Sequence, residues 1–336
     1  MAIRNRLSGD LSPVQLRERL RASVCIEVAH HESARLYLPA SLIYDYPIDT
    51  ARSSVTLCPE FVRALDKHVE LHATPCFSEG CPNAKANAKK QDVVCPSGFW
   101  GFRHKMGLPL SVGRSPDPAP EFPAGPSGRT FLAAVSLELD HASPLEHIRN
   151  LGVRDGWNYR VSESRDEVVE LFQTTGPHVV YLYCHGGLDV NGIVYVSLGG
   201  TNPTAPEANR ITFDNLTAYE IDWGRSRPLV FLNGCRTAVP RPDRVMDLIS
   251  DFVRVARASG VIGTEITIFE SLACRFAPAC LRPFLRGVRL GEAVRQARLE
   301  VLAAQNPLGL VYVPYAPHGL WFAKVATAPV SQPDAA

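Results

Sequence analysis

The sequence has no apolar run that approaches the roughly 18 residues of a membrane-spanning helix. Its N-terminal stretch, MAIRNRLSGDLSPVQLRERLRAS, is charged throughout and lacks the apolar segment of an export signal. An excess of either charge is also missing, because 35 Lys and Arg residues face 34 Asp and Glu residues. We therefore expect a cytoplasmic protein that does not insert into membranes and has no long-range field to attract nucleic acid.

Internal repeats of solenoid length are likewise absent, and a single segment has a strongly biased composition. Residues 112–129, VGRSPDPAPEFPAGPSGR, contain five prolines and three glycines, which disfavour both a helix and a central strand. We interpret this segment as a linker on the surface. The expected parts are a charged N-terminal segment, a Cys-containing N-terminal part, the linker, a catalytic core and a tail, over residues 1–21, 22–111, 112–129, 130–325 and 326–336.

After the linker, apolar runs of strand length alternate with longer stretches of helical periodicity. This alternation is typical of an α/β fold in which helices flank a mainly parallel sheet. The expected strands cover residues 131–139, 159–161, 179–184, 228–233, 260–264 and 308–312. The expected helices cover residues 144–151, 162–173, 244–257, 269–285 and 291–304.

Two of the expected strands end in residues that carry chemistry, at the edge where open parallel sheets bind ligands. The run VVYLYC leads directly into His185, Gly186 and Gly187, and the run PLVFLN leads into Gly234 and Cys235. An imidazole can take the proton of a thiol at neutral pH, and it can then protonate a leaving amine. We predict that His185 and Cys235 are the catalytic pair. The backbone N–H groups of Gly186 and Cys235 are the predicted oxyanion donors.

A single cysteine is by default a buried packing residue, so Cys235 stands out only together with His185. The default applies to four further cysteines, which are Cys25, Cys184, Cys274 and Cys280. Two rival functions stay open beside a peptidase. One is an inactive scaffold or interaction protein with the same fold, and the other is a thiol acyl transferase or amidohydrolase.

The arrangement of His185 and Cys235 resembles that of caspases, in which a histidine followed by glycine precedes the nucleophile by about 50 residues. The separation here is 50 residues, but the surrounding LNGCRTA differs from the QAC-type sequence of caspases. It is more similar to the CHAT branch, caspase relatives named for their association with tetratricopeptide repeats. Four further segments carry the same resemblance, which covers roughly residues 22–325: YLPASLIYDYPID, VCPSGFWGFRH, GVIGTE and LGLVYVPYAPHGLWF.

This resemblance implies a caspase-hemoglobinase fold and a cysteine endopeptidase that needs no catalytic cofactor. Many bacterial relatives belong to defence systems in which cleavage of a partner, such as a gasdermin-like pore-forming protein, triggers cell death. The resemblance therefore implies a protein substrate of that kind. Because the 336 residues contain no tetratricopeptide repeat, any activating sensor is expected on another chain or is missing.

Three carboxylates are candidates for the pocket that binds the residue before the cleaved bond. Glu265 and Glu270 follow the strand expected at residues 260–264, and Asp189 follows the His185 loop. A buried carboxylate there would favour arginine or lysine through a charge-assisted pair. The alternative is that Glu265 caps the next helix and that Glu270 points to solvent.

The N-terminal part contains a group of cysteines, Cys58, Cys76, Cys81 and Cys95, within 38 positions. Thiolates at such spacing can close a tetrahedral zinc site, although the usual zinc ribbon has tighter CxxC pairs. Three interpretations stay open: a structural zinc ion, reduced thiols, or disulfides, of which the last are disfavoured in the cytosol.

Overall fold

The computed structural model describes residues 12–31, 39–86, 91–111, 121–122, 128–139, 143–153, 156–200, 204–234, 249–264 and 266–323. Its centre is a six-stranded sheet with the strand order β16-β15-β14-β10-β8-β9. The strands are β8 (Arg129–Val135), β9 (Trp157–Ser162), β10 (Val179–Tyr183), β14 (Leu229–Asn233), β15 (Gly260–Thr264) and β16 (Tyr312–Tyr315). Neighbouring strands run parallel except β15 and β16. The predicted α/β fold with a mainly parallel sheet is confirmed.

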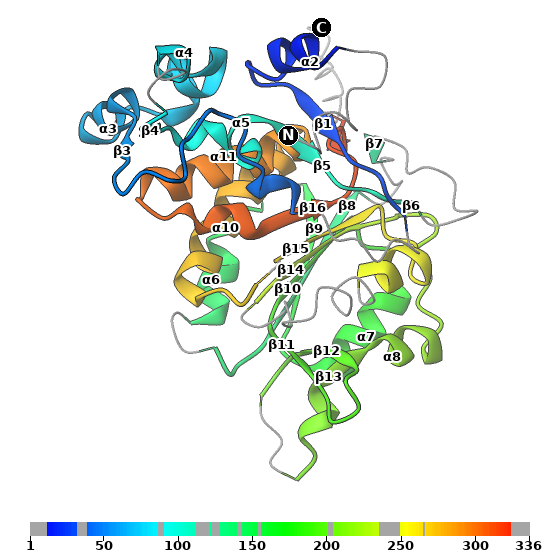
Figure 1. Cartoon of the computed structure of the whole chain (residues 1–336). Coiled ribbons are helices and arrows are strands. Elements are labelled where there is room, and N and C mark those ends of the chain that lie inside the picture. Colours follow the sequence, from blue (N-terminus) through cyan, green and yellow to red (C-terminus); the bar gives the residue numbers. More distant parts are fainter. Residues whose placement is uncertain are drawn as a thin grey trace, which may run out of the picture.

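Helices cover both faces of this sheet (Figure 1). They are α6 (Pro144–Arg149), α7 (Arg165–Thr174), α8 (Phe213–Ala218), α10 (Glu270–Leu285) and α11 (Leu290–Ala303). Tyr181 and Phe231 point to the face that carries α6, α10 and α11. Their neighbours Val180 and Val230 point to the opposite face, where α7 and α8 pack. Because both faces are buried, these strands are continuous apolar runs rather than alternating ones.

A smaller antiparallel sheet lies beyond the carboxyl end of β10 (Figure 1). It consists of β11 (His185–Leu188), β12 (Val194–Ser197) and β13 (Arg210–Thr212). A parallel bridge between Ser136 and Gly199 joins this sheet to the end of β8. The segment after β10 is therefore held on two sides, by the central sheet and by its own hairpin.

Short elements build the N-terminal part, which packs against α11 through residues 71–73 and 100–107 (Figure 1). They are α2 (Pro13–Arg19), β1 (Cys25–Glu27), β2 (His30–His31), β3 (Thr56–Leu57), α3 (Pro59–Asp66), α4 (Pro82–Ala86), β4 (Val93–Val94), α5 (Trp100–Arg103), β5 (Lys105–Gly107) and β6 (Leu110–Ser111). β1 pairs with β5, β2 with β6 and β3 with β4. Within the predicted linker, β7 (Glu121–Phe122) pairs with β17 (Trp321–Phe322), and Phe122 is buried there.

One predicted strand is wrong, the one expected at residues 308–312. Pro307–Val311 forms a short 3-10 helix, and the strand β16 begins only at Tyr312. Pro307 occupies the first helical position, and the side chain of Asn306 accepts a hydrogen bond from the Leu308 N–H at 2.9 Å. These two local signals outweigh the apolar run that follows. The helix expected at residues 244–257 lies partly outside the described residues, of which residues 249–254 are helical.

Candidate active site

The two strands that precede His185 and Cys235 are direct neighbours in the central sheet. β10 and β14 run parallel, and each β10 residue pairs with the β14 residue 50 positions later, up to Tyr183 with Asn233. Beyond this last pair, the N–H of Cys184 still donates to the carbonyl oxygen of Asn233 at 3.4 Å. His185 and Cys235 are separated by the same 50 positions. In the sequence, each of the two residues therefore stands two positions after the last pair, Tyr183 and Asn233.

Gly234 lies in close contact with Cys184, the residue that follows β10. A Cβ atom added to Gly234 would lie 1.6 Å from the carbonyl oxygen of Cys184, far inside the 3.0 Å limit of real Cβ contacts. Only glycine fits this position, because the atom in the way belongs to the backbone of the neighbouring strand. Cys235, which follows Gly234, lies outside the described residues, and so does Glu265.

His185 is the first residue of β11 and is half-buried. Its Nε2 atom lies 3.2 Å from the backbone carbonyl oxygen of Glu138, which follows β8. A carbonyl oxygen can only accept, so Nε2 must carry the hydrogen and donate it. In the neutral ring this leaves Nδ1 with its lone pair free to accept a proton. The Glu138 carbonyl thus fixes both the tautomer and the orientation of the imidazole.

The two glycines after His185 lie in the β11–β12 pairing. Gly186 is buried and pairs with Val196. At Gly187 an added Cβ would lie 2.7 Å from the hydroxyl oxygen of Tyr195 on the partner strand. Gly187 therefore makes room for the tyrosine side chain. The predicted role of the Gly186 N–H as an oxyanion donor stays a prediction.

A buried polar network lies directly beneath the end of β14, around the side chain of Asn233. The Asn233 amide nitrogen donates to the Tyr181 hydroxyl at 2.5 Å and to the Ala273 carbonyl oxygen at 3.1 Å. The Tyr312 hydroxyl donates to the Asn233 amide oxygen at 2.6 Å. His147 Nε2 lies 2.5 Å from the Tyr181 hydroxyl. This network joins three strands of the sheet to α6 and α10, two residues before Cys235.

The network is electrically neutral at neutral pH. Burial lowers the pKa of His147 to about 4 and raises the pKa of Tyr181 well above its ordinary value. Because the Tyr181 hydroxyl accepts from Asn233, it has its own proton to donate to Nε2 of His147. Each side-chain group of Asn233 therefore has a partner, as a buried amide requires.

The four cysteines of the N-terminal part come together, as their spacing predicted. Cys58, Cys76, Cys81 and Cys95 are buried, and their sulfur atoms all lie within 4.8 Å of one another. Among the cysteines expected to be buried, Cys184 and Cys280 are, Cys274 is half-buried and Cys25 is exposed. The expectation of a buried packing residue was therefore wrong for Cys25, which lies on the short strand β1.

Comparison with known proteins gives a family match over the strands and helices just described. The model of the family described as "CHAT domain" matches residues 148–327, more than half of the chain. The chain belongs to the CHAT domain family. The recognition made from the sequence is confirmed.

A relative of this CHAT protein is named a probable protease of Vitiosangium sp. (strain GDMCC 1.1324). It is 40% identical over 322 residues, which are 93% of this chain and 41% of the relative, so this chain spans less than half of that protein's length. Two similar solved structures are of gingipain R, an Arg specific cysteine proteinase, and of the complex of Porphyromonas gingivalis RgpB pro- and mature domains. The first has a TM-score of 0.44 at 9% identity and covers 82% of this chain and 79% of its own. The second has a TM-score of 0.43 at 8% identity and covers 80% and 79%.

The predicted specificity carboxylates of the CHAT domain occupy different environments. The Asp189 carboxylate accepts hydrogen bonds from the backbone N–H groups of Asn191 at 2.9 Å and Ile193 at 2.7 Å, in the turn between β11 and β12. It therefore already stabilises that turn. Glu270 is half-buried at the first position of α10. A substrate contact by Asp189, Glu265 or Glu270 stays a prediction.

Sequence reasoning missed the Glu138 carbonyl and the network of Tyr181, His147 and Tyr312. A backbone carbonyl has no sequence signature, but Asn233 does, since it is a polar residue at the end of the apolar run PLVFL. It also missed exposed apolar side chains at this edge of the CHAT domain. They are Leu137, Val190, Ile266 and Phe269, with exposed fractions of 47%, 101%, 46% and 72%.

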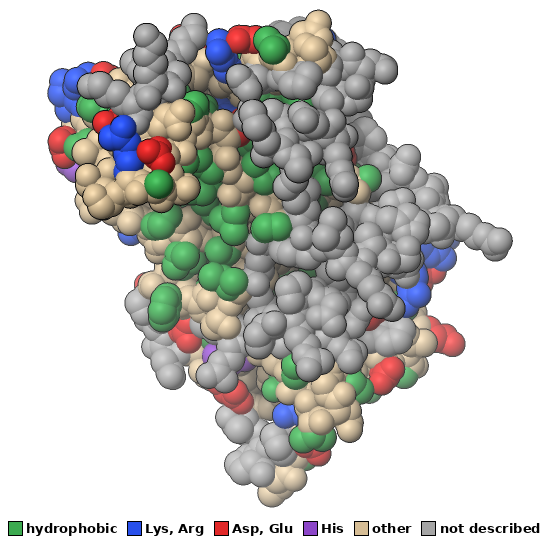
Figure 2. Space-filling model, in the orientation of Figure 1, with side chains coloured by type: hydrophobic (Ala, Val, Ile, Leu, Met, Phe, Trp, Pro, Cys, Tyr) green, Lys and Arg blue, Asp and Glu red, His purple; other side chains and the backbone are tan. Residues whose placement is uncertain are grey.

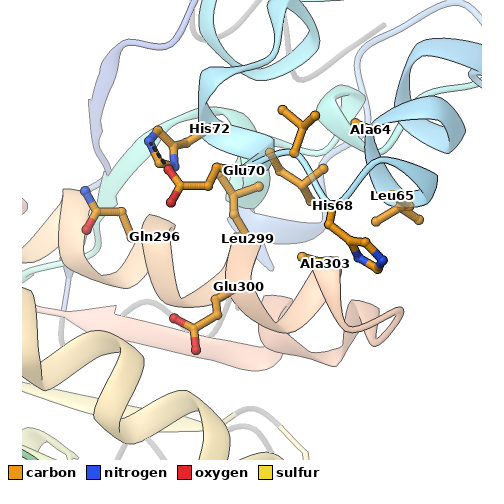
Figure 3. Close-up of a pocket in the computed structure, with 11 residues that line it drawn as sticks. Ala64, Leu65, His68, Glu70, His72, Gln296, Leu299, Glu300 and Ala303 are labelled. Atoms are coloured by element: carbon orange, nitrogen blue, oxygen red, sulfur yellow. Dashed lines mark ion pairs between the residues drawn. The ribbon is translucent and has the colours of Figure 1, made fainter.

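A cavity of about 410 Å³ lies away from this edge, between the end of α3 and α11 (Figure 3). Apolar side chains such as Leu65 and Leu299 line it together with His68, Glu300 and a His72–Glu70 ion pair at 3.4 Å. The cavity contains none of the predicted catalytic or specificity residues, so the candidate active site does not rest on it.

The surface of the CHAT domain carries both signs of charge on the face drawn in Figure 2. Acidic and basic side chains lie together at the upper and lower ends, and hydrophobic side chains gather between them over the region of α10 and α11. Of the helices that the structure describes, none combines the length and the apolar character needed to cross a bilayer.

Proposed function

We propose that this CHAT domain is a cysteine endopeptidase in which Cys235 is the nucleophile and His185 the general base. The observation that carries the proposal is the β10–β14 register, whose last pair, Tyr183 with Asn233, stands two sequence positions before His185 and Cys235. The hydrogen bond from His185 Nε2 to the Glu138 carbonyl adds direct support, because it leaves Nδ1 as the proton acceptor.

The reaction follows from the chemistry of the pair. His185 Nδ1 takes the thiol proton, and the thiolate attacks the carbonyl carbon of the scissile peptide bond. The resulting oxyanion accepts the backbone N–H groups of Gly186 and Cys235. The C–N bond then breaks as the imidazolium protonates the leaving amine, and water hydrolyses the thioester that remains. No step needs a metal ion or an organic cofactor.

The substrate is a protein, in this proposal, with a basic residue before the cleaved bond. Glu265 and Glu270 are the candidates to pair with it, because the Asp189 carboxylate already accepts two backbone N–H groups in its own turn. The exposed side chains of Ile266 and Phe269 beside them offer apolar contacts to neighbouring substrate residues. Peptides that differ only in arginine, aspartate or leucine at that position test the preference, and faster cleavage after aspartate would reject it.

We also propose a role in a bacterial defence or cell-death pathway in the cytoplasm, with a gasdermin-like pore-forming protein as the substrate and a sensor on another chain. The likeness to the CHAT branch supports this finer proposal, as does a relative named a probable protease. Co-expression with a candidate pore-forming partner checks it, since a single cleavage that requires Cys235 is expected.

The decisive experiment is labelling with a thiol-reactive peptide chloromethylketone ending in arginine. We expect modification of Cys235 in the wild type, and no modification in Cys235→Ala or His185→Ala. Cys25→Ser is the matched control, because Cys25 is exposed and lies on β1 rather than at the sheet edge. It should be labelled like the wild type. Equal labelling of all nine thiols, or unchanged labelling in His185→Ala, would contradict the proposal.

The same experiment separates the rival functions. An inactive scaffold would show no labelling that depends on His185. An acyl transferase or amidohydrolase would be labelled at Cys235 but would release no peptide fragments, so mass spectrometry of a digested bacterial lysate distinguishes it from an endopeptidase. New N-termini that require both Cys235 and His185 are the expected result.

A further inference from the structure

The cysteine cluster is formed by four residues from three short segments. Cys58 precedes α3, Cys76 begins a single π-helical turn (Cys76–Gly80), Cys81 ends that turn, and Cys95 precedes a 3-10 turn. The Cys58–Cys76 and Cys58–Cys81 sulfur distances are 3.9 Å and 3.5 Å. All four sulfurs thus surround one point in the interior of the N-terminal part.

These distances fit a metal ion better than disulfide bonds. Zinc–thiolate bonds of about 2.3 Å in a tetrahedron place the sulfurs about 3.8 Å apart, between the two values above. A disulfide needs two sulfurs at about 2.05 Å. Two disulfides also do not require all four sulfurs to surround one point. We propose that Cys58, Cys76, Cys81 and Cys95 bind a structural zinc ion as thiolates.

The backbone brings the ligands together in two pairs. β3 and β4 pair directly before Cys58 and Cys95, and the Cys58 N–H donates to the Val94 carbonyl oxygen at 2.8 Å. The π-helical turn returns the chain from Cys76 to Cys81, and Gly80 has the positive φ of 96° that this return requires. Two ligand pairs, each held by a local turn or pairing, are the usual construction of a structural zinc site.

Groups around the sulfurs donate hydrogen bonds to them, as the charge of a thiolate site requires. The Asn83 amide nitrogen donates to Cys58 Sγ at 3.2 Å. The Ser97 hydroxyl lies 3.2 Å from Cys95 Sγ. Outer donors such as Asn83 orient metal ligands and offset their negative charge. Four protein ligands leave no position for substrate or water, so the role of the ion is structural.

The zinc ion ties a set of short elements to the catalytic core. Arg295 on α11 donates to the carbonyl oxygens of Phe77 at 2.7 Å and Arg103 at 3.0 Å. Phe77 lies inside the π-helical turn, and the cluster packs on Leu299 and Leu302 of α11. The short helices of the N-terminal part add little stability of their own, so this part depends on contacts between side chains. A metal ion bound by four side chains can supply such contacts.

Metal content of the purified full chain tests the proposal. Elemental analysis should find about one zinc per chain in the wild type and in the matched double variant Cys25→Ser/Cys274→Ser, and less than about 0.2 in Cys76→Ser/Cys81→Ser. Protein expressed with cobalt should show the visible absorption of tetrahedral cobalt–thiolate coordination. Less than about 0.2 zinc in the wild type would overturn the proposal.

If Cys76→Ser/Cys81→Ser does not fold, a substitution at a residue that is not a zinc ligand still tests the proposal. Asn83→Ala removes the donor to Cys58 and should weaken zinc binding about 10- to 100-fold in competition with a chelator, whereas exposed Asn191→Ala should not change it. Alkylation of denatured, non-reduced wild type then counts the free thiols. Four protected sulfurs in metal-free protein would identify disulfides and overturn the proposal, and nine free thiols after zinc removal would support it.

Discussion

The edge of the central sheet and the cysteine cluster are both sites where distant residues meet, but different forces bring them together. At the sheet edge, the backbone register of β10 and β14 aligns the segments that carry His185 and Cys235. In the N-terminal part the paired strands β3 and β4 have only two residues each, and the four cysteine side chains make the contacts that form the cluster. Backbone changes should therefore damage the first site most, and side-chain changes the second.

The largest effect should come from Gly234→Ala at the sheet edge. The new methyl group would collide with the Cys184 carbonyl oxygen, and neither backbone can move without breaking the ladder between β10 and β14. We expect a loss of more than about 4 kcal/mol in the free energy of unfolding, together with loss of Cys235 labelling. Gly319→Ala is the matched control, because an added Cβ there meets no atom within 4 Å. Urea denaturation of both variants measures the difference, and similar midpoints would refute this account of the edge.

The next largest effect should come from a side chain in the N-terminal part, in Arg103→Met. Arg103 is fully buried, and its Nη2 donates to both carboxylate oxygens of Asp45 at 2.6 Å. Its loss leaves the largely buried carboxylate without its cation, at a cost of about 3–4 kcal/mol. In the exposed Arg63–Glu60 pair at 2.8 Å, Arg63→Met should cost less than about 1 kcal/mol. Equal losses in the two variants would show that burial does not set the energy of these pairs.

Acid should weaken both regions, because a buried neutral histidine lies in each, His147 beside the central sheet and His104 in the N-terminal part. Burial lowers the pKa of His147 to about 4, and burial with the charges of Arg103 and Arg295 lowers the pKa of His104 to about 2. The unfolded chain binds these protons near pH 6.5, before the folded chain does, so stability is full above that pH and falls below it. Each histidine should contribute about 2 kcal/mol of loss between pH 6.5 and pH 5.

The slope of the unfolding free energy against pH identifies the contribution of each histidine. His147→Gln and His104→Gln should each reduce the pH dependence of the unfolding free energy by about 1.4 kcal/mol per pH unit, and by equal amounts in the two regions. Asn191→Ala, at an exposed position whose side chain does not titrate, serves as the control and should leave the slope unchanged. If the His147 variant also kept the wild-type slope, the proton would be bound in the folded state as well.

The carboxyl ends of the central strands could be predicted from the sequence, because an apolar run and the residue that ends it are neighbours in the chain. The strand expected at residues 260–264 is β15 with the same bounds, and an apolar run ends directly at His185. The small sheet after β10 was not predicted, since the two glycines after His185 indicate a turn as readily as a strand. Its other strands, β12 and β13, have only four and three residues, so their apolar pattern is too short to identify them.

Long-range polar contacts were the part of the site that the sequence could not predict. The Glu138 carbonyl reaches His185 because β8 lies beside β10, and the strand order is a property of the whole fold. The cysteine cluster is the opposite case, because residue type and spacing alone pointed to four side chains that do converge. Residue types and their spacing can be read from a sequence, whereas contacts that depend on the strand order, such as those of the Glu138 carbonyl and of Tyr181 with His147, cannot.

The smallest effect sharpens the comparison, because it concerns a side-chain contact within the backbone-controlled region. Tyr312→Phe removes the donor to the Asn233 amide oxygen and leaves that buried atom without this 2.6 Å hydrogen bond. We expect a loss of about 1–2 kcal/mol in unfolding free energy and slower labelling of Cys235, two residues further along. Tyr159→Phe, which removes a 3.3 Å bond at a half-buried position, should cost less than half as much. A stability loss without any change in the labelling rate would show that the network supports the fold but does not position the nucleophile.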